Sequence, residues 1–185
     1  MSSHVVTEFG TSPAWLFGKL PRHGDFVARG LDQSARDRFD TWLSEAMIEA
    51  RTALGPAFED AYDTAPPWRF VQHDAATQWT GGALCASMDS AGRRFPLVVA
   101  RSAEDAATAT LAALGCELAV YRAFDEALDA DQLWAIAATE SPDGIPEPAS
   151  AGWWTEGNDD FPPARTAAGF DPSLIVAMLR GGAHG

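Results

Sequence analysis

Residues 82–101, with the sequence GALCASMDSAGRRFPLVVAR, decide the fold class. Two apolar stretches, residues 82–88 and 95–101, flank a polar segment that contains glycine. This pattern predicts two strands joined by a hairpin or a longer β-turn connection, so the two strands are expected to pair in antiparallel fashion. Residues 97–100 are apolar on both faces, which is typical of a central strand that is covered on both sides.

Four further segments are predicted to be extended, namely residues 14–18, 25–30, 68–72 and 153–155. Proline and glycine punctuate the connection between the first two segments, and both residue types favour turns. The third segment alternates between large apolar and polar side chains, as a strand with two unlike faces does. The chain therefore contains enough predicted strands for a sheet.

The best-defined element is a helix over residues 34–54. Ser34 and Asp37 have the spacing of a capping-box-like pair at its start, and Gly55 followed by proline ends it. Its apolar side chains recur at steps of three and four residues, which places them on one face. They are Phe39, Trp42, Leu43, Ala46, Met47, Ala50 and Leu54.

A second long helix is predicted over about residues 103–128. Ser102 and Asp105 repeat the start signal of the first helix. Gly115 lies inside it and costs about 1 kcal/mol relative to alanine, so a break or a close backbone contact is expected there. The predicted apolar stripe of this helix consists of Leu111, Leu114, Leu118, Tyr121, Phe124 and Leu128.

Two shorter helices are expected over residues 131–139 and 171–179, the second of them capped by Asp171. Long amphipathic helices need a sheet face on which to bury their apolar sides. The predicted fold is therefore α+β and layered, with a mixed or largely antiparallel sheet packed against two or more amphipathic helices. At 185 residues the chain fits a single domain over 1–185, with a core at about 14–180 and a flexible segment at 1–12.

The composition excludes several classes of function. Thirteen basic residues against 26 acidic ones give a net charge of −13. Phosphate binding needs a dense field of Lys and Arg, so nucleic acid is not expected as a partner, and an anionic membrane surface is disfavoured. The start shows no signal-peptide pattern and no run of 18 apolar residues occurs, so we expect a cytoplasmic protein without membrane insertion. Cys85 and Cys116 are expected to be buried, reduced thiols.

Residues 22–25 form the densest polar cluster, and three interpretations stay open. In a catalytic site, Asp25 would orient His23 as a general base while Arg22 holds an anion. In a tight turn, Gly24 permits the bend and Asp25 caps backbone N–H groups. The third interpretation is a loop that faces a partner. Catalysis would also require a nucleophile, and the sequence offers no obvious one.

Other candidate groups also have structural and functional interpretations. Arg93 and Arg94 lie on the predicted hairpin connection. Three interpretations of this pair stay open, namely a solvated tip, a salt-bridge anchor and a small phosphate-binding spot.

Most of the seven tryptophans are expected in the core. Adjacent residues on a strand face opposite ways, so one of Trp153 and Trp154 is a candidate for the surface. The four histidines are scattered, and the sequence predicts no metal site and no other cofactor.

Four motifs in chain order resemble those of the TagF/ImpM family, which is associated with type VI secretion. Residues 15–27, WLFGKLPRHGDFV, resemble its opening FGKLPxxGDF motif, and residues 65–70, APPWRF, resemble its APxWRF segment. Residues 82–97 are similar to its GVLxPSxDxxGRxFPL hairpin, with Ala86 where the family often has proline. A later tryptophan pair also matches, so the resemblance covers about residues 15–154.

The resemblance implies a cytoplasmic regulator that represses type VI secretion after translation. Such a protein binds a scaffold protein with a forkhead-associated domain and transforms no substrate. The net charge indicates a basic surface on that partner. The resemblance carries over no catalytic residue. The candidate partner-binding or motif residues are Lys19, Pro21, Arg22, His23, Gly24, Asp25, Trp68, Arg69, Asp89, Arg93, Arg94 and Trp154.

Two alternatives to a regulator remain at this stage. The first is a small hydrolytic or phosphate-handling enzyme that uses the loop at residues 22–25, with Arg69 as a further basic group. A concave pocket that holds these side chains together would favour it. The second is a structural subunit of the secretion apparatus, which stable and stoichiometric co-purification with the assembled machine would support.

Overall fold

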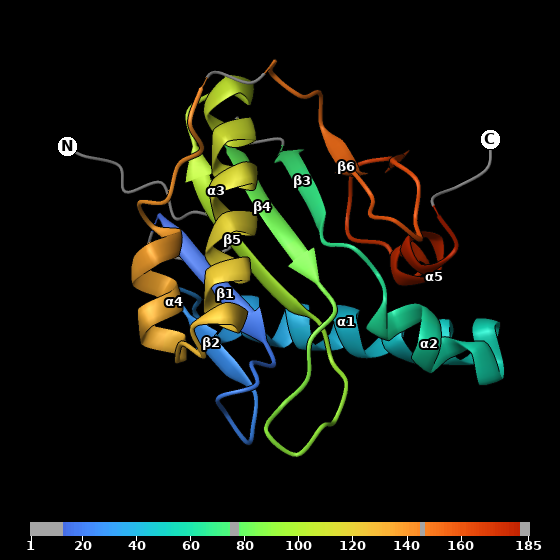
Figure 1. Ribbon diagram of the computed structural model, residues 1–185. Coiled ribbons are helices and arrows are strands. Elements are labelled where there is room, and N and C mark those ends of the chain that lie inside the picture. Colours follow the sequence, from blue (N-terminus) through green and yellow to red (C-terminus); the bar gives the residue numbers. More distant parts are fainter. Residues whose placement is uncertain (1–12, 75–77, 145–146, 182–185) are drawn as a thin grey trace.

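The computed structural model describes residues 13–74, 78–144 and 147–181 (Figure 1). The segment predicted to be flexible, residues 1–12, lies outside the described residues. Within them, seven strands form one sheet in the order β2-β1-β5-β4-β3-β6-β7, and all neighbouring strands are antiparallel. The predicted α+β fold is confirmed.

The strands are β1 (Ala14–Gly18), β2 (Val27–Arg29), β3 (Trp68–His73), β4 (Trp79–Cys85), β5 (Leu97–Ala103), β6 (Gly152–Thr155) and β7 (Ala164–Thr166). The predicted hairpin is confirmed, because β4 and β5 pair with Leu84 opposite Val98. Residues 97–100 of β5 are fully buried, as expected for a central strand. The sequence analysis missed β7, whose three residues carry no alternation of apolar and polar side chains.

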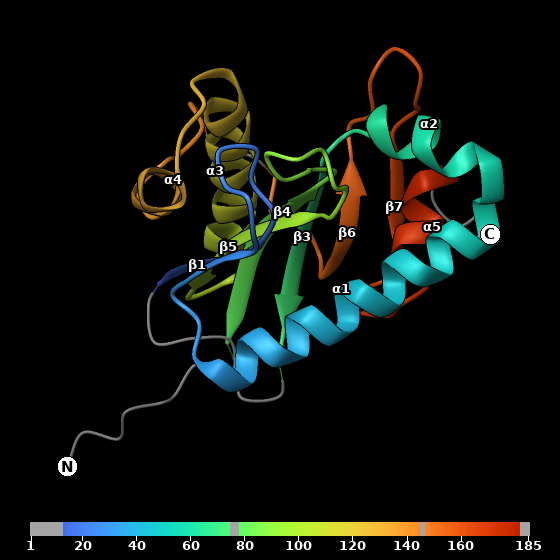
Figure 2. The ribbon, with the colours of Figure 1, turned by 90° about the horizontal axis from the view of Figure 1, so that it is seen from below.

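The helices are α1 (Gln33–Leu54), the 3₁₀ turn η1 (Gly55–Ala57), α2 (Phe58–Asp63), α3 (Ala106–Asp125), α4 (Ala130–Ala137) and α5 (Leu174–Leu179). In Figure 2, α1, α2 and α5 lie on one side of the sheet, and α3 and α4 lie on the other. No helix among the described residues has the length and apolar character needed to cross a bilayer. The sheet is thus the middle layer of three.

The helices begin at neighbouring residues rather than at the predicted caps. Asp32 caps α1, because its carboxylate accepts a hydrogen bond from the Ala35 N–H at 2.7 Å. Ser34 lies inside that helix. Asp105 alone caps α3, while Ser102 still belongs to β5. At α5 the N-cap is Ser173, and the Asp171 carboxylate accepts from its N–H and its hydroxyl. Aspartate and serine are about equally good N-cap residues, so the sequence alone does not decide between two of them that lie close together.

The predicted apolar stripe of α3 does not face the sheet. Leu118, Tyr121 and Phe124 are 40%, 47% and 37% exposed. The side of α3 that packs on the sheet consists mainly of small residues, namely Ala109, Ala112, Ala113, Gly115, Cys116, Ala119, Val120 and Ala123. Large side chains therefore gave a misleading pattern, because a helix that lies this close to a sheet must present small ones.

Two glycines show how closely the backbones approach in this layer. A Cβ atom on Gly81 of β4 would lie 1.8 Å from the backbone oxygen of Ala109 in α3. A Cβ atom on Gly115 would lie 2.1 Å from the backbone oxygen of Glu140. The close backbone contact expected at Gly115 is confirmed, and the helix continues through it without a break.

The prediction that one tryptophan of β6 lies at the surface is also wrong. Trp153 and Trp154 face opposite sides of the strand, but they are only 1% and 6% exposed, because helical layers cover both faces of the sheet. Trp153 packs in the cluster with Trp42 of α1, with ring centroids 6.5 Å apart. Trp154 packs against α3, and the Arg165 guanidinium lies over its ring at 5.9 Å.

We predict that Gly81→Ala destabilises the fold strongly. The new methyl group meets the backbone of α3, which has to move away, and such overpacking costs about 1–3 kcal/mol or more. The free energy of unfolding from urea titration measures the effect. Gly24→Ala is the matched control, because its Cβ would lie in ordinary contact, 3.4 Å from the Ser90 hydroxyl. Equal stability of the two variants would contradict the close approach of α3 to β4.

Candidate functional site

Two loops at one end of the sheet carry most of the predicted site residues. They are residues 19–26, between β1 and β2, and residues 86–96, between β4 and β5; we call them the motif loops. Figure 1 shows both extending beyond the same end of the sheet. They meet because β1 and β5 are paired, with Gly18 opposite Leu97.

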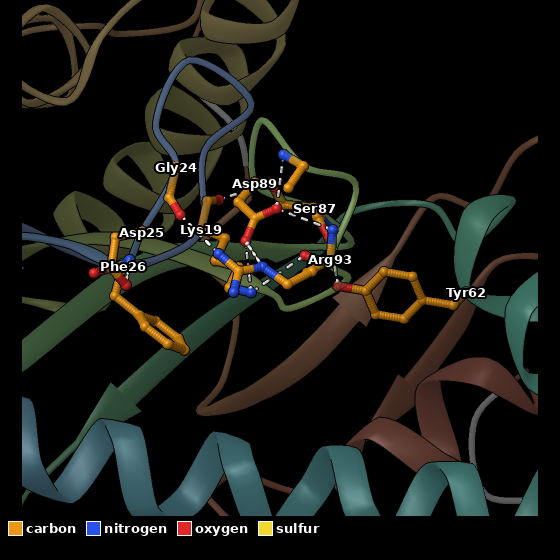
Figure 3. Close-up of polar contacts among 9 residues, drawn as sticks. Lys19, Gly24, Asp25, Phe26, Tyr62, Ser87, Asp89 and Arg93 are labelled. Carbon is orange, nitrogen blue, oxygen red and sulfur yellow. Dashed lines mark hydrogen bonds and ion pairs between the residues drawn. The ribbon is translucent and has the colours of Figure 1, made fainter.

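The carboxylate of Asp89 lies at the centre of the motif loops (Figure 3). Its side chain is fully buried. Its Oδ2 atom lies 2.9 Å from Lys19 Nζ and 2.8 Å from Arg93 Nε. Its Oδ1 atom accepts hydrogen bonds from the backbone N–H groups of Ala91 and Arg93, both at 3.0 Å. The hydrogen bond from Lys19, followed by those from Arg93 and Ala91, holds the pKa of Asp89 well below its usual range.

Further hydrogen bonds join the two loops to each other. The Ser87 hydroxyl donates to the Lys19 carbonyl at 2.7 Å, and the Ser90 N–H donates to the His23 carbonyl at 2.8 Å. Arg93 Nη2 donates to the Gly24 carbonyl at 2.8 Å. Side chains and backbone of both loops take part, so the motif loops form one connected unit.

Tyr62 of α2 fastens this unit to the helical layer. Its hydroxyl donates to the Ser87 carbonyl and accepts from the Ser87 N–H, both at 3.0 Å (Figure 3). Burial raises the pKa of this phenol far above its usual value, so the hydroxyl keeps its proton. Ala86, at the position where proline was expected from the family pattern, packs partly buried against the adjacent core.

Glycine is required at Gly18 rather than at Gly24. Gly18 has φ of +137°, and a Cβ there would lie 2.0 Å from the Pro96 oxygen. The next residue, Lys19, donates its backbone N–H to that same oxygen at 3.3 Å. The chain bends at Gly24, but φ there is not positive, so the bend does not require glycine. The special backbone conformation instead brings the first loop against the second.

The polar side chains of residues 22–25 do not converge on one point. His23 Nε2 accepts a hydrogen bond at 3.0 Å from the backbone N–H of Ala130, the first residue of α4. Asp25 is exposed, and its carboxylate accepts from the neighbouring Phe26 N–H at 2.8 Å. Arg22 is exposed and donates to the Ala127 carbonyl at 3.4 Å. His23 therefore has a structural role, while Arg22 and Asp25 face solvent.

The motif loops also expose apolar side chains. Phe26 is 45% exposed, although its ring packs edge-on to Phe95 at 4.8 Å and lies 5.2 Å from Lys19 Nζ. Met88 is 36% exposed, and the Arg93 side chain is 65% exposed. The sequence analysis did not single out Phe26 or Met88. The sequence did contain a signal for them, because each of the two polar turns includes one of these large apolar residues.

Arg94 turns away from Arg93 and toward α2. It forms two hydrogen bonds of 2.7 Å with the Asp63 carboxylate and lies 3.2 Å from Glu59. Of the three interpretations of the Arg93–Arg94 pair, the salt-bridge anchor fits Arg94. The Asp63 pKa is lowered, chiefly by the hydrogen bond from Arg94.

The remaining predicted site residues lie in the core, on other strands or in solvent. Trp68 is buried and packs in the core between the sheet and α1. Arg69 of β3 forms ion pairs with Glu117 and Glu156, at 2.5 and 3.2 Å. Pro21 is exposed in the first motif loop. Trp154 is buried, as described above.

The described residues bring together no three His, Cys, Asp or Glu side chains that could hold a metal ion. Burial raises the pKa of both Cys85 and Cys116 to about 12, so each is a protonated thiol at neutral pH. An open groove of about 920 Å³ runs along α1 beside Phe39, Trp42 and Phe170. None of its lining residues belongs to the motif loops.

We predict that Asp89→Asn lowers the thermal stability by more than a surface change does. The amide leaves Lys19 and Arg93 without their shared counter-charge, and a shift of the melting temperature on the order of 5 °C or more is expected. Differential scanning calorimetry measures it. Asp40→Asn, on the exposed side of α1, is the control. A melting temperature equal to that of the control variant would show that the buried carboxylate does not hold the loops.

The stabilisation by Asp89 has a predictable dependence on pH. Its pKa is lowered in the folded state, so its contribution is present above the unfolded value of about 3.9 and is lost as pH falls toward the folded value. The difference in unfolding free energy between the wild type and Asp89→Asn should stay constant from pH 7 to 5. It should shrink below about pH 4. Urea titrations at several pH values give this difference, and a gap that already closes between pH 7 and 5 would refute the assignment.

Comparison with known proteins places the chain in a family. Residues 15–141, more than half of the chain, match the family described as TagF N-terminal domain, Type VI secretion system-associated. The crystal structure of PA0076 from Pseudomonas aeruginosa PAO1 has the same fold, with a TM-score of 0.71 and 22% identity over 93% of this chain and 96% of that one. Among curated proteins, no significant match was found. The family match covers the first motif, the hairpin and both long helices, and the chain therefore belongs to the TagF family of type VI secretion-associated proteins.

Proposed function

We propose that this chain is a cytoplasmic, non-enzymatic regulator that represses the assembly or activity of a type VI secretion system by binding a protein. The expected partner is the scaffold protein with a forkhead-associated domain, and the motif loops make the contact. One observation carries the proposal. The buried polar groups of the loops bond to each other around Asp89, while Phe26, Met88 and Arg93 stay partly exposed to solvent.

This arrangement suits recognition of another protein. Aromatic, methionine and arginine side chains are enriched at protein interfaces, and a few of them usually carry most of the binding energy. Loops that are already fixed lose little conformational entropy on binding. The motif loops meet both conditions, because Asp89, Ser87 and Tyr62 hold their backbone in place.

The charge around the loops adds specificity. Lys19 and Arg93 share the single carboxylate of Asp89, so this cluster carries an excess positive charge in a chain whose net charge is −13. Arg22 and Asp25 are exposed beside it. The overall negative field would steer a basic partner toward the molecule. At the contact itself, the excess positive charge of the loops would face an acidic group of that partner, which selects the orientation.

An enzyme built on residues 22–25 has less support. A general base needs a ring nitrogen within reach of the substrate proton. His23 Nε2 instead accepts a hydrogen bond from the start of α4, and the Asp25 carboxylate bonds to its own neighbour. A structural subunit would co-purify with the assembled apparatus in a fixed stoichiometry, and this distinguishes it from a regulator.

We predict that Arg22→Ala combined with Asp25→Ala weakens binding to the scaffold about tenfold or more without lowering the melting temperature. Both side chains are exposed, so their loss removes contacts to a partner and little from the fold. Isothermal titration calorimetry with the purified scaffold of the same bacterium measures the affinity. Arg36→Ala with Asp40→Ala removes the same two residue types from the exposed side of α1 and serves as the matched control.

Unchanged affinity of the loop variant, or an equal loss in the α1 control, would contradict the proposed contact. His23→Ala should behave differently from both. It deprives the Ala130 N–H of its acceptor, so it should lower the melting temperature even where the scaffold is absent. Repeating the titration at low and high salt tests the electrostatic part, since binding that does not weaken with salt would refute it.

A further inference from the structure

The outer face of α3 is apolar although no other described element covers it. This face consists of Leu111, Leu114, Leu118, Tyr121 and Phe124. The first two are half-buried, whereas the last three are among the most exposed large apolar side chains of the protein. Figure 1 shows α3 as the outermost element on its side of the sheet, with α4 beside it rather than over it.

Such a helix is unusual on a protein surface. The opposite side of α3 is fully occupied by its packing on the sheet, so α3 is apolar on both its inner and its outer side. A surface helix normally has one apolar side, which it buries, and a polar side opposite. Scattered single residues need no explanation, and Ile48, which is 66% exposed on α1, is of that kind. Leu118, Tyr121 and Phe124 instead follow one another at three-residue steps and form a continuous ridge.

Two acidic clusters flank this ridge. Arg69 is shared between Glu117 of α3 and Glu156, at 2.5 and 3.2 Å. Arg122 of α3 is likewise shared between two carboxylates, Glu126 and Glu140, at 3.1 and 3.2 Å. In each cluster one cation therefore meets two anions, which leaves an excess negative charge.

The clusters lie on opposite sides of Leu118 and Tyr121. Glu117 and Arg122 are five positions apart, which corresponds to roughly 140° around the helix axis, and Leu118 and Tyr121 point between them. The outer face of α3 thus combines an apolar centre with an anionic border on both sides. That border is complementary to an apolar stripe bordered by Lys and Arg.

We propose that the outer face of α3 is a docking site for a basic amphipathic helix of a partner protein. The partner's apolar stripe would pack on Leu118, Tyr121 and Phe124. Its cations would face the solvent-accessible carboxylates of the borders, which are Glu156 on one side and Glu126 and Glu140 on the other. A second copy of this chain is the wrong occupant. Two copies would bring the same acidic borders and a charge of −13 against each other.

The inference does not depend on the proposed function of the motif loops. The two surfaces nevertheless adjoin, because the segment after α3 contributes the Ala127 carbonyl and the Ala130 N–H that contact Arg22 and His23. A single partner can therefore contact both surfaces. Each surface is tested with variants that leave the other intact.

Site-specific photocrosslinking in the bacterium that produces the protein tests the proposal. Replacing Leu118 with p-benzoylphenylalanine puts the crosslinker on the ridge, and the same replacement of Ile48 on α1 is the matched control. Mass spectrometry then maps the crosslinked peptide of the partner. The expected peptide has apolar residues at three- and four-residue steps and an excess of Lys and Arg. The expected crosslinking yield is about tenfold above that at Ile48.

Crosslinks to a second copy of this chain, to an acidic segment, or only to lipid would overturn the proposal. So would a yield equal to that at Ile48. The mapped segment is then synthesised and titrated against the purified chain by fluorescence anisotropy. Leu118→Gln should weaken its binding about tenfold, with the melting temperature unchanged, and Ile48→Gln should not. Failure of the peptide to bind, or equal binding by both variants, also overturns the proposal.

The loop variant separates this proposal from the proposed function. Arg22→Ala with Asp25→Ala should leave the affinity for the synthetic peptide unchanged, because neither residue belongs to the outer face of α3. Loss of peptide binding in that variant, with retention in Leu118→Gln, would place the helix on the motif loops and refute the α3 site. Loss of scaffold binding alone bears only on the motif loops.

Discussion

A single buried carboxylate, that of Asp89, determines how one end of this molecule is organised. An ionised group out of water is costly unless charged and polar donors surround it, so Lys19 and Arg93 have to lie beside it. These residues come from loops that are about 70 positions apart in the chain, and their contact joins the start of the sheet to its central hairpin. The charged motif residues Lys19, Asp89 and Arg93 therefore serve to hold the two loops together.

The bonding of these polar residues to one another bears on whether the motif loops catalyse a reaction or bind a partner. Catalysis needs side chains that are free to exchange protons or bond to substrate, but His23 supports the start of α4 and Asp89 is saturated by its donors. What the loops offer to the outside is a fixed shape with an aromatic ring, a thioether and two arginines. Such a surface is suited to recognise another macromolecule, in keeping with membership of a family associated with type VI secretion.

Local patterns predicted the elements that depend on local physics. The hairpin of β4 and β5, the buried face of α1 and the Trp68 strand followed from alternation, from helical spacing and from glycine or proline at the ends. The orientation of α3 did not, because the pattern of large side chains was taken as the buried one. The decisive feature was Gly81 on a different element, which lets α3 approach so closely that only small residues fit between helix and sheet.

The residues of the candidate site could be predicted from the sequence, but the contacts between them could not. Lys19, Asp89 and Arg93 belong to motifs that are recognisable in the sequence, yet no spacing rule connects residues of two distant loops. Long-range pairing decides which of them meet. Trp154 shows the same limit, because the alternation of β6 was right but the layer that covers its second face comes from α3.

We propose that the fixed motif loops bind a protein partner. Hydrogen–deuterium exchange of the full chain, with and without the purified scaffold, tests it most directly. We expect slower exchange concentrated at residues 19–26 and 86–96 when the scaffold is bound. Formation of the complex with exchange at both loops unchanged would contradict it.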